Sequence, residues 1–193
     1  MAGTTCATAK SYFDTMSALL TQLDPAPIDT FADILDRART DGRHVWVFGN
    51  GGSAYNASHY VTDFVKTAAV EGVPRLKAVS LVDNYGMTTA LGNDVSYDDT
   101  FVYPLESYAQ KGDVAVAISC SGNSPNIVKA CQWAKDKGLT VVAISGFKGG
   151  KMAGFADVHI NVPHDNYGII EDVHLSVGHI VAQAIFEKAK ARQ

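Results

Sequence analysis

Five short apolar segments, separated by stretches with helical periodicity, constrain the fold of this chain more than any other feature. They are rich in Val, Ile and Ala, and they cover residues 44–48, 76–81, 114–119, 140–145 and 158–162. Strands that are nearly continuous in apolar residues are typical of sheets covered on both faces. The alternation therefore predicts a parallel sheet in a layered α/β domain.

Helical patterns lie between the predicted strands and after the last one. They cover residues 53–68, 85–91, 125–137 and 169–191. The last helix carries an apolar stripe that we expect to face the core, made of Ile170, Val173, Val177, Val181 and Ala184.

Two further helices are predicted before the first strand. In the first, apolar residues recur at spacings of three and four, which is typical of a buried stripe: Phe13, Met16, Leu20 and Leu23. The prolines of "DPAPID" end this helix, and residues 28–39 form the second. The stripe can pack on the sheet or on another copy of the chain, and the sequence leaves both arrangements open.

Length and composition fit one compact domain, because 47% of the 193 residues are hydrophobic. We expect a single unit over residues 1–193, with a helical pair at 1–42 and the α/β core at 43–193. The net charge of -4 and the lack of a basic run argue against nucleic-acid binding. Cys6, Cys120 and Cys131 show no CxxC spacing, which argues against a disulfide framework or a Cys-rich zinc site.

Hydropathy gives no indication of a membrane partner. The first residues, "MAGTTCATAK", lack an apolar signal region, and no apolar run approaches the roughly 20 residues that span a bilayer. The expected location is therefore the cytoplasm.

Two loops of similar character each join a predicted strand to a helix. They are "GNGGS" at 49–53 and "SCSGNS" at 119–124. Ligands of open parallel sheets lie beyond the carboxyl ends of the strands. Glycines allow close backbone approach, and the free amides of the following helix favour an anion. Either loop alone is also consistent with a simple turn and cap, but together they predict an anion site.

A nucleotide-binding site is the alternative interpretation of the first loop. The spacing Gly49-x-Gly51-x-x-Ala54 fits the dinucleotide pattern, but that pattern alone is weak. No acidic residue follows about 20 positions later, and Asp83 is nearer 30 away. A G-x-x-x-x-G-K-[ST] loop is also missing. We therefore expect no organic cofactor.

Acidic and histidine side chains follow the first loop and occupy the last helix. His59 and Asp63 are one helical turn apart and share a face, so they can bind a metal, act as a base with its orienting partner, or form an inert pair. Glu171 and His174 are three residues apart and are expected to be neighbours on the helix surface, although His174 also fits a buried or capping role. Glu171 and His179 are eight residues apart, about 12 Å along the axis. They meet one metal only if both side chains stretch or come from different copies, and otherwise contact different ends of one substrate.

Taken together, these segments resemble the SIS (sugar isomerase) domain family, and most closely its phosphoheptose isomerase branch. The likeness covers nearly the whole chain and rests on "GNGGS", "SHYVTDF", "GNDVSYDD", "SCSGNSPNIVKA", "GFKGGKMAGFAD", "VPH" and "EDVHLSVGH". The resemblance implies a three-layer sandwich, flavodoxin-like or Rossmann-like, with a five-stranded parallel sheet. It also implies a homotetramer with active sites between subunits and N-terminal helices that serve assembly.

The resemblance implies conversion of sedoheptulose 7-phosphate to D-glycero-D-manno-heptose 7-phosphate. By motif position, Ser119, Ser121 and Ser124 would hold the phosphate. The other implied substrate-binding residues are Asn50, Gly51, Gly52, Ser53, Asn93, Asp94, Cys120 and Glu171. The implied zinc ligands, for one ion per site, are His59, Asp63, Glu171 and His179. Asp63 and His179 fall on the positions of the catalytic base and acid.

Two departures from the family pattern bear on catalysis. Asp63 stands where the family usually has Glu, and Glu171 stands where it has Gln. Asp is shorter by one methylene, and a misplacement of about 1 Å can cost about 100-fold in rate. Glu171 adds a carboxylate, which can attract a divalent ion or replace Asp63 as the base. Cys120, where Thr is common, is expected to line the site without a chemical role, and the loop between His164 and Glu171 is about one residue shorter than usual.

Aldose–ketose isomerisation needs a base beside a carbonyl and an acid for its oxygen, and a carboxylate with a histidine meets this need. The phosphate supplies remote binding energy that places the reacting carbons. The alternative is a non-catalytic SIS protein that binds a phosphosugar and regulates a protein partner. Retention of His59, His179 and the carboxylates favours the enzyme.

Overall fold

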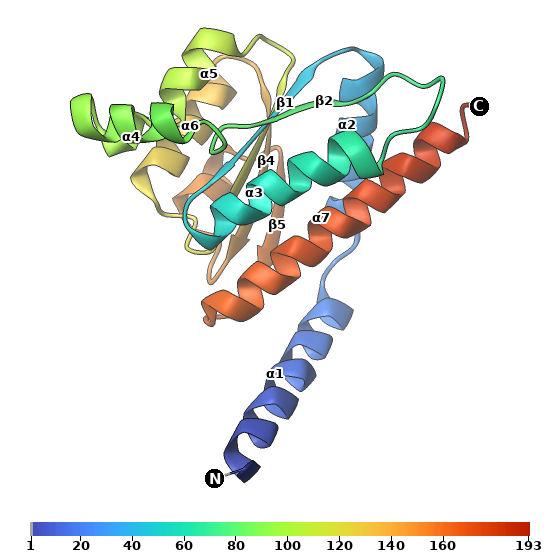
Figure 1. The fold of residues 1–193 in the computed structure, drawn as a ribbon, viewed down its shortest axis with the longest axis vertical. Helices are drawn as coiled ribbons and strands as arrows, with labels where there is room; N and C mark the ends of the chain where they lie inside the picture. The colour runs from blue at the N-terminus through green and yellow to red at the C-terminus, as the bar shows by residue number, and fades with distance from the viewer. Residues whose placement is uncertain (1) are drawn as a thin grey trace.

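The chain folds around one five-stranded parallel sheet with the strand order β2-β1-β3-β4-β5 (Figure 1). The strands are β1 (His44–Gly49), β2 (Lys77–Ser80), β3 (Val114–Ser119), β4 (Thr140–Gly146) and β5 (Val158–Val162). The computed structural model describes the backbone of residues 2–193 and the side chains of residues 7–193, so Cys6 lies outside the described side chains. All five predicted strands are confirmed to within one or two residues.

Seven α-helices surround or extend from the sheet in the described part of the chain. They are α1 (Ala2–Gln22), α2 (Ala26–Thr40), α3 (Gly52–Thr62), α4 (Tyr85–Asp94), α5 (Val102–Tyr108), α6 (Pro125–Asp136) and α7 (Tyr167–Lys190). Three short segments add to them: η1 (Asp63–Thr67), which is π-helical, and two 3-10 turns, η2 (Tyr97–Asp99) and η3 (Lys151–Phe155).

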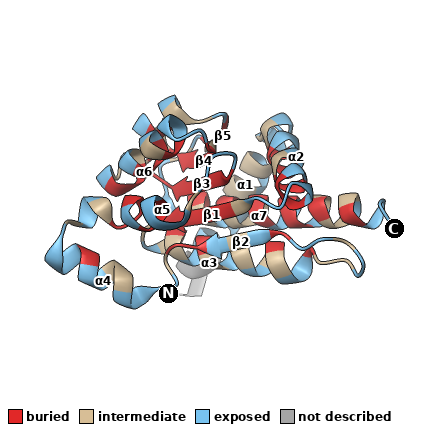
Figure 2. Ribbon diagram, turned by 90° about the horizontal axis from the view of Figure 1, so that it is seen from above, coloured by how far each residue is buried: buried red, intermediate tan, exposed pale blue. Residues whose placement is uncertain are grey.

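Alternate strand residues point to opposite faces, and each face is covered by its own helices. Val45 and Val47 of β1 pack in a core with buried residues of α2, α3 and α7. Trp46 and Phe48 of the same strand pack on the other side with residues of α5 and α6. Figure 2 shows the buried residues concentrated in the sheet and on the inner sides of these helices. The predicted three-layer α/β sandwich is confirmed.

Helix α1 extends away from the rest of the molecule (Figure 1). Met16, Leu20 and Leu23 pack in part against a small core cluster that includes Ile170 of α7. Phe13, in contrast, is 68% exposed. Of the predicted stripe, Met16, Leu20 and Leu23 therefore pack on the domain, whereas the Phe13 side chain lies open in the single chain although its neighbour Tyr12 hydrogen-bonds Asp172 of α7.

Two local features differ from the predictions. Helix α5 was not predicted; it accommodates Pro104 at its third position, because a proline within the first turn of a helix costs no hydrogen bond there. The helix predicted over residues 53–68 is α-helical only to Thr62 and continues as the π-helical segment η1. The prolines in "DPAPID" do separate α1 from α2, with Pro25 at the N-cap of α2.

Helix α7 is long and apolar enough, by length and composition, to span a membrane, and it is the one such helix in the described part of the chain. Half of its apolar window is buried inside the fold, where α7 packs against α2 and α3. The apolar character of α7 is therefore that of the core helix that the stripe from Ile170 to Val181 predicts.

Helices α3 and α7 are in tight contact where Tyr60 meets Gly178. Tyr60 is fully buried, and its hydroxyl donates a hydrogen bond to the backbone carbonyl of His174. A Cβ atom added at Gly178 would lie 2.1 Å from Cε1 of Tyr60. The missing side chain of Gly178 thus makes room for the tyrosine ring, and this contact fixes how the two helices lie against each other.

We expect Gly178→Ala to lower the free energy of unfolding by about 1–3 kcal/mol, because the added methyl group overpacks against the Tyr60 ring. Urea denaturation followed by circular dichroism measures the change. Gly154→Ala is the matched control, since nothing lies within 4 Å of a Cβ atom added there. Equal stability of the two variants would contradict the proposed tight contact.

Candidate active site

Both predicted ligand loops lie at the same edge of the sheet. β1 pairs in parallel with β3, with Gly49 opposite Ile118, so the loops that follow these strands are neighbours. They enclose a cleft of about 310 Å³ together with the start of α7. The cleft is lined by Asn50, Gly51, Gly52, Ser53, Ser119, Cys120, Ser121, Ser124, Tyr167 and Glu171.

The serine loop, residues 119–124, offers hydrogen-bond donors without any formal charge. Gly122 adopts a φ of 63°, and its amide donates to the backbone carbonyl of Ser119 at 3.1 Å, which makes the turn. Ser124 occupies the N-cap of α6 but makes no side-chain capping bond. The hydroxyl groups of this loop and the amides at the start of α6 are therefore suited to an anion.

Glu171 is the one carboxylate among the residues that line the cleft. A Cβ atom at Gly52 would lie 2.2 Å from Glu171 Oε1, so only glycine allows the carboxylate to approach the start of α3 this closely. The positive end of the α3 dipole favours a negative charge at that place. The cleft thus combines neutral anion-binding groups with a single acidic side chain.

Cys120 lies against the same carboxylate, with Sγ 3.9 Å from Glu171 Oε1. Burial, aided by the negative charge of Glu171, raises the pKa of the Cys120 thiol to about 11. The thiol is therefore protonated near neutral pH, and a thiolate nucleophile at this position is not expected.

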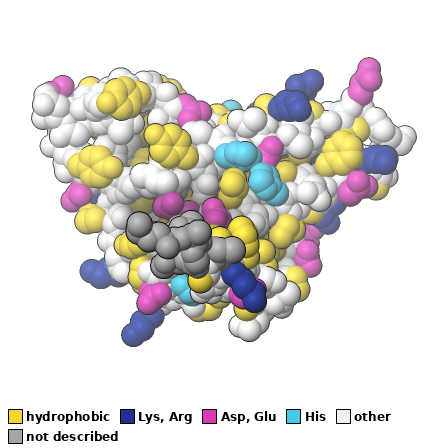
Figure 3. All heavy atoms as spheres, turned by 60° about the horizontal axis from the view of Figure 1, so that its bottom comes forward, with side chains coloured by type: hydrophobic (Ala, Val, Ile, Leu, Met, Phe, Trp, Pro, Cys, Tyr) yellow, Lys and Arg dark blue, Asp and Glu magenta, His cyan; other side chains and the backbone are white. Residues whose placement is uncertain are grey.

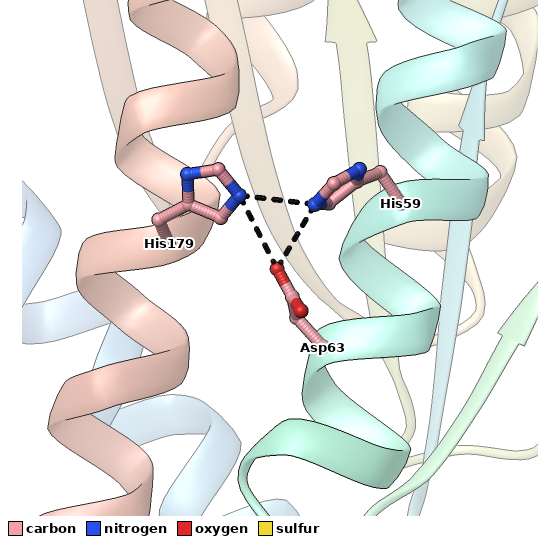
Figure 4. Close-up of side chains that lie close together, drawn as sticks. All are labelled: His59, Asp63 and His179. Atoms are coloured by element: carbon pink, nitrogen blue, oxygen red, sulfur yellow. Dashed lines mark hydrogen bonds and ion pairs between the residues drawn. The ribbon is translucent and has the colours of Figure 1, made fainter.

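His59, Asp63 and His179 form a second polar centre between α3 and α7 (Figure 4). Asp63 Oδ2 lies 3.2 Å from His59 Nε2 and 3.5 Å from His179 Nε2. The two Nε2 atoms lie 2.9 Å from each other. The side chains of both histidines are about half exposed, at 46% and 45%, and Figure 3 shows histidine side chains gathered on the open surface.

Two imidazole nitrogens and one carboxylate oxygen, all within 4.8 Å of one another, are a donor set that fits Zn²⁺. Where the two Nε2 atoms contact each other directly, one donates a hydrogen bond and the other accepts it. Asp63 also accepts a hydrogen bond from Thr67 Oγ1 at 2.9 Å, which orients its carboxylate. The π-helical segment begins at Asp63, and such segments are frequent at functional sites.

Glu171, the fourth predicted metal ligand, is not part of this cluster. It lies in the cleft, and His179 is eight residues further along α7, about 12 Å along the helix axis. Within one chain, the structure therefore assembles three of the four residues. The fourth can join only if it comes from another copy of the helix, as the sequence analysis left open.

Asn93 and Asp94 are the two predicted substrate contacts that do not line the cleft of this chain. They are exposed at the carboxyl end of α4, where Asn93 Nδ2 donates to Asp94 Oδ1 at 2.6 Å. The remaining nine predicted substrate-binding residues all line it.

Three residues near the cleft were missed by the sequence analysis: Tyr97, Asn126 and Tyr167. Tyr167 lines the cleft and is one turn before Glu171 on α7, a spacing that could have revealed it. Asn126 and Tyr97 both hydrogen-bond to the side chain of Asn50. Tyr97 also lines a second hollow of about 410 Å³ on the other side of "GNGGS".

His174 is fully buried, so the expectation that it neighbours Glu171 on the surface of α7 is wrong. Its Nε2 donates a hydrogen bond to the carbonyl of Ser145 at 3.0 Å, and its Nδ1 has no partner. Burial lowers the pKa of His174 to about 4. The ring is therefore neutral and structural, which confirms the buried role predicted for it.

Comparisons with known proteins agree with this geometry. The family model of the SIS domain matches residues 11–146. A probable phosphoheptose isomerase of Thermoplasma acidophilum is 38% identical over 180 residues, which cover 93% of this chain and 98% of the relative.

Two solved structures of phosphoheptose isomerases have the same fold. The one from Francisella tularensis superposes with a TM-score of 0.88 and 26% identity, over 95% of this chain and 99% of that one. The one from Neisseria gonorrhoeae has a TM-score of 0.84 and 29% identity, over 94% and 96%.

The burial of neutral His174 predicts a loss of stability in acid. Above pH 6.5 the ring is neutral in both states and contributes nothing. Between pH 6.5 and about 4 only the unfolded chain binds the proton, so the free energy of unfolding falls by up to about 3 kcal/mol. Urea denaturation from pH 7 to 4.5 should show that the free energy of unfolding falls less steeply in His174→Gln than in the wild type. Burial also lowers the pKa of the half-buried His159, but this histidine contributes equally in both proteins. Equal slopes would contradict this assignment.

Proposed function

The chain belongs to the SIS domain family, and we propose that it isomerises sedoheptulose 7-phosphate to D-glycero-D-manno-heptose 7-phosphate. It is an aldose–ketose isomerase, as its phosphoheptose isomerase relatives indicate. The observation that carries the proposal is the single cleft in which the serine loop, "GNGGS" and the Glu171 carboxylate meet. An anion anchor beside a carboxylate is what a phosphorylated sugar needs for binding and proton transfer.

We assign the phosphate to the serine loop and the sugar to Asn50, Gly51 and Gly52. Ser119, Ser121 and Ser124 donate from their hydroxyl groups. Because this anchor lies away from the reacting carbons, its binding energy serves to place them. Asn93 and Asp94 lie outside the cleft of their own chain, and we infer that they contact substrate only in the assembled enzyme.

The reaction needs one proton removed from C1 and one delivered to the ketone oxygen at C2, which gives a 1,2-enediol. Returning a proton to C2, while the oxygen on C1 loses its own, gives the aldose. We assign the base to Glu171, because its carboxylate lies in the cleft, whereas Asp63 is held by His59, Thr67 and His179. His179, oriented by Asp63, is the acid.

Glu171 and His179 are about 12 Å apart along α7. Two groups that handle neighbouring atoms of one substrate must lie closer than this. We therefore infer that His179 of one copy faces the cleft of another, within the homotetramer that the family resemblance implies. Residues 1–42, including the exposed Phe13 of α1, would serve this assembly, and residues 43–193 would form the α/β core of a single domain.

We further propose that, in a zinc-loaded form, His59, Asp63 and His179 would hold one Zn²⁺ per site, whereas His179 acts as the acid in the metal-free form. When bound, the ion supplies Lewis-acid polarisation of a substrate oxygen. No organic cofactor, nucleic acid or membrane is part of the proposal, and the location that suits such an enzyme is the cytoplasm.

A phosphosugar-binding regulator that acts on a protein partner is the second candidate. The cleft alone suits this role as well, since binding needs no acid or base. The clustering of His59, Asp63 and His179 at hydrogen-bonding distances favours the isomerase, because a regulator has no need of it.

Turnover is the direct test. Incubation of the protein with sedoheptulose 7-phosphate, with and without zinc, should produce the aldose signal in NMR spectra. His179→Gln and Glu171→Gln should each lower kcat by about 100-fold or more, because each removes one proton-transfer group. Retained binding of the sugar phosphate in calorimetry without turnover would favour the regulator, and an unchanged rate for Glu171→Gln would return the role of base to Asp63.

Zinc titration tests the metal site separately. The wild-type chain should bind Zn²⁺ and rise in melting temperature with its concentration, whereas Asp63→Asn and His179→Gln should weaken binding at least 10-fold. His164→Gln, which changes a histidine outside the cluster, is the control. A loss of affinity in Glu171→Gln would make Glu171 a fourth ligand, and unchanged affinity in His179→Gln would exclude the proposed site.

A further inference from the structure

A buried asparagine joins the two ligand loops. Asn126 is the second residue of α6, is only 1% exposed, and is not among the residues that line the candidate cleft. Its Nδ2 donates to Asn50 Oδ1 at 3.0 Å, and Asn50 Nδ2 donates to Asn126 Oδ1 at 2.9 Å. This reciprocal pair of amide bonds connects the start of "GNGGS" to the helix that directly follows the serine loop.

Every hydrogen-bonding position of the Asn126 side chain is occupied. The second Nδ2 hydrogen goes to Thr100 Oγ1 at 3.0 Å, and Oδ1 also accepts from the amide of Ile127 at 3.0 Å. An asparagine side chain has two donors and about two acceptor sites. A buried and fully satisfied network of this kind permits one arrangement of its members.

The Asn50 side chain is largely committed to the same network. Its Oδ1 accepts from both Asn126 and the hydroxyl of Tyr97, the latter at 3.1 Å. One Nδ2 hydrogen is used by Asn126, which leaves one donor and the backbone for a ligand. The first residue after Gly49 in "GNGGS" is thus tied to α6, the helix that follows the serine loop, by hydrogen bonds within the protein.

We propose that Asn126 is a positioning residue for the isomerase site: it holds the loop that contacts the sugar at the distance that the bound phosphate requires. This inference rests on the proposed assignment of the two loops to the two parts of one ligand. Its specific consequence is that losing the Asn126–Asn50 pair weakens recognition of a whole sugar phosphate but not of a phosphate ion alone.

The test compares Asn126→Leu, Asn126→Asp and wild type with two ligands. We expect Asn126→Leu, which removes all four side-chain bonds, to lower kcat/KM for sedoheptulose 7-phosphate by 10- to 100-fold, since small misplacements in a reacting complex cost this much. Its affinity for inorganic phosphate, measured by calorimetry, should change less than about threefold, because the serine loop keeps its own turn bonds. Asn126→Asp keeps the acceptor for Asn50 Nδ2, so its kcat/KM should lie between those of the wild type and Asn126→Leu.

Controls separate positioning from general damage. Thr100→Val removes one of the four Asn126 side-chain bonds, together with the bond from the Thr100 hydroxyl to the carbonyl of Tyr97, and should have a smaller effect than Asn126→Leu. Ser107→Ala, on the exposed side of α5, should have none. If Asn126→Leu does not fold, Asn126→Asp and Thr100→Val carry the comparison.

A parallel loss of sugar phosphate and inorganic phosphate affinity would overturn the proposal, because Asn126 would then only support the serine loop. An unchanged kcat/KM would also overturn it. If the wild type binds sedoheptulose 7-phosphate without turnover, the proposed isomerase function is wrong, but the role of Asn126 can still be tested. Calorimetry then decides it, because Asn126→Leu should weaken binding of sedoheptulose 7-phosphate more than binding of inorganic phosphate.

Discussion

The parallel pairing of β1 with β3 is the constraint on which the rest of the site depends. It places the loops after these strands at one edge of the sheet, although about 70 residues separate them in the chain. Because ligands of such sheets bind beyond the carboxyl ends of the strands, one cleft can hold both ends of a phosphorylated sugar. The hydrogen bonds between Asn50 and Asn126 then hold these two loops at a defined distance from each other.

Close contacts at glycine then bring the helices to that edge. Gly52 lets the Glu171 carboxylate reach the start of α3, and Gly178 lets Tyr60 pack into α7. The residues beside this second contact are His59 and His179, so the packing of a tyrosine on a glycine also brings the two imidazoles together. A side chain at either glycine would separate the groups that the chemistry needs.

The sheet and most of the cleft were predictable because their determinants are local. Continuous apolar runs mark the covered strands, and nine of the eleven substrate contacts that the family resemblance implies line one cleft. The reciprocal bonds of Asn126 were not predictable, because they join residues 76 positions apart and the sequence around Asn126 looks like an ordinary first turn. The burial of His174 was equally hidden, since only the packing of α7 decides which of its faces is inside.

Glu171 is separate from the histidine cluster, and this separation affects the roles of the two residues that depart from the family pattern, Asp63 and Glu171. Asp63 is too short to reach far from α3, yet it meets both histidines because α3 and α7 lie in tight contact there. The added carboxylate of Glu171 lies about two turns away along α7, in the cleft and beside Gly52 at the start of α3. One chain thus holds one carboxylate in the cleft and another carboxylate with the imidazoles. An enediol mechanism needs a base and an acid at adjacent atoms, so these two centres serve one reaction only when the cleft of one copy meets the histidine pair of the next.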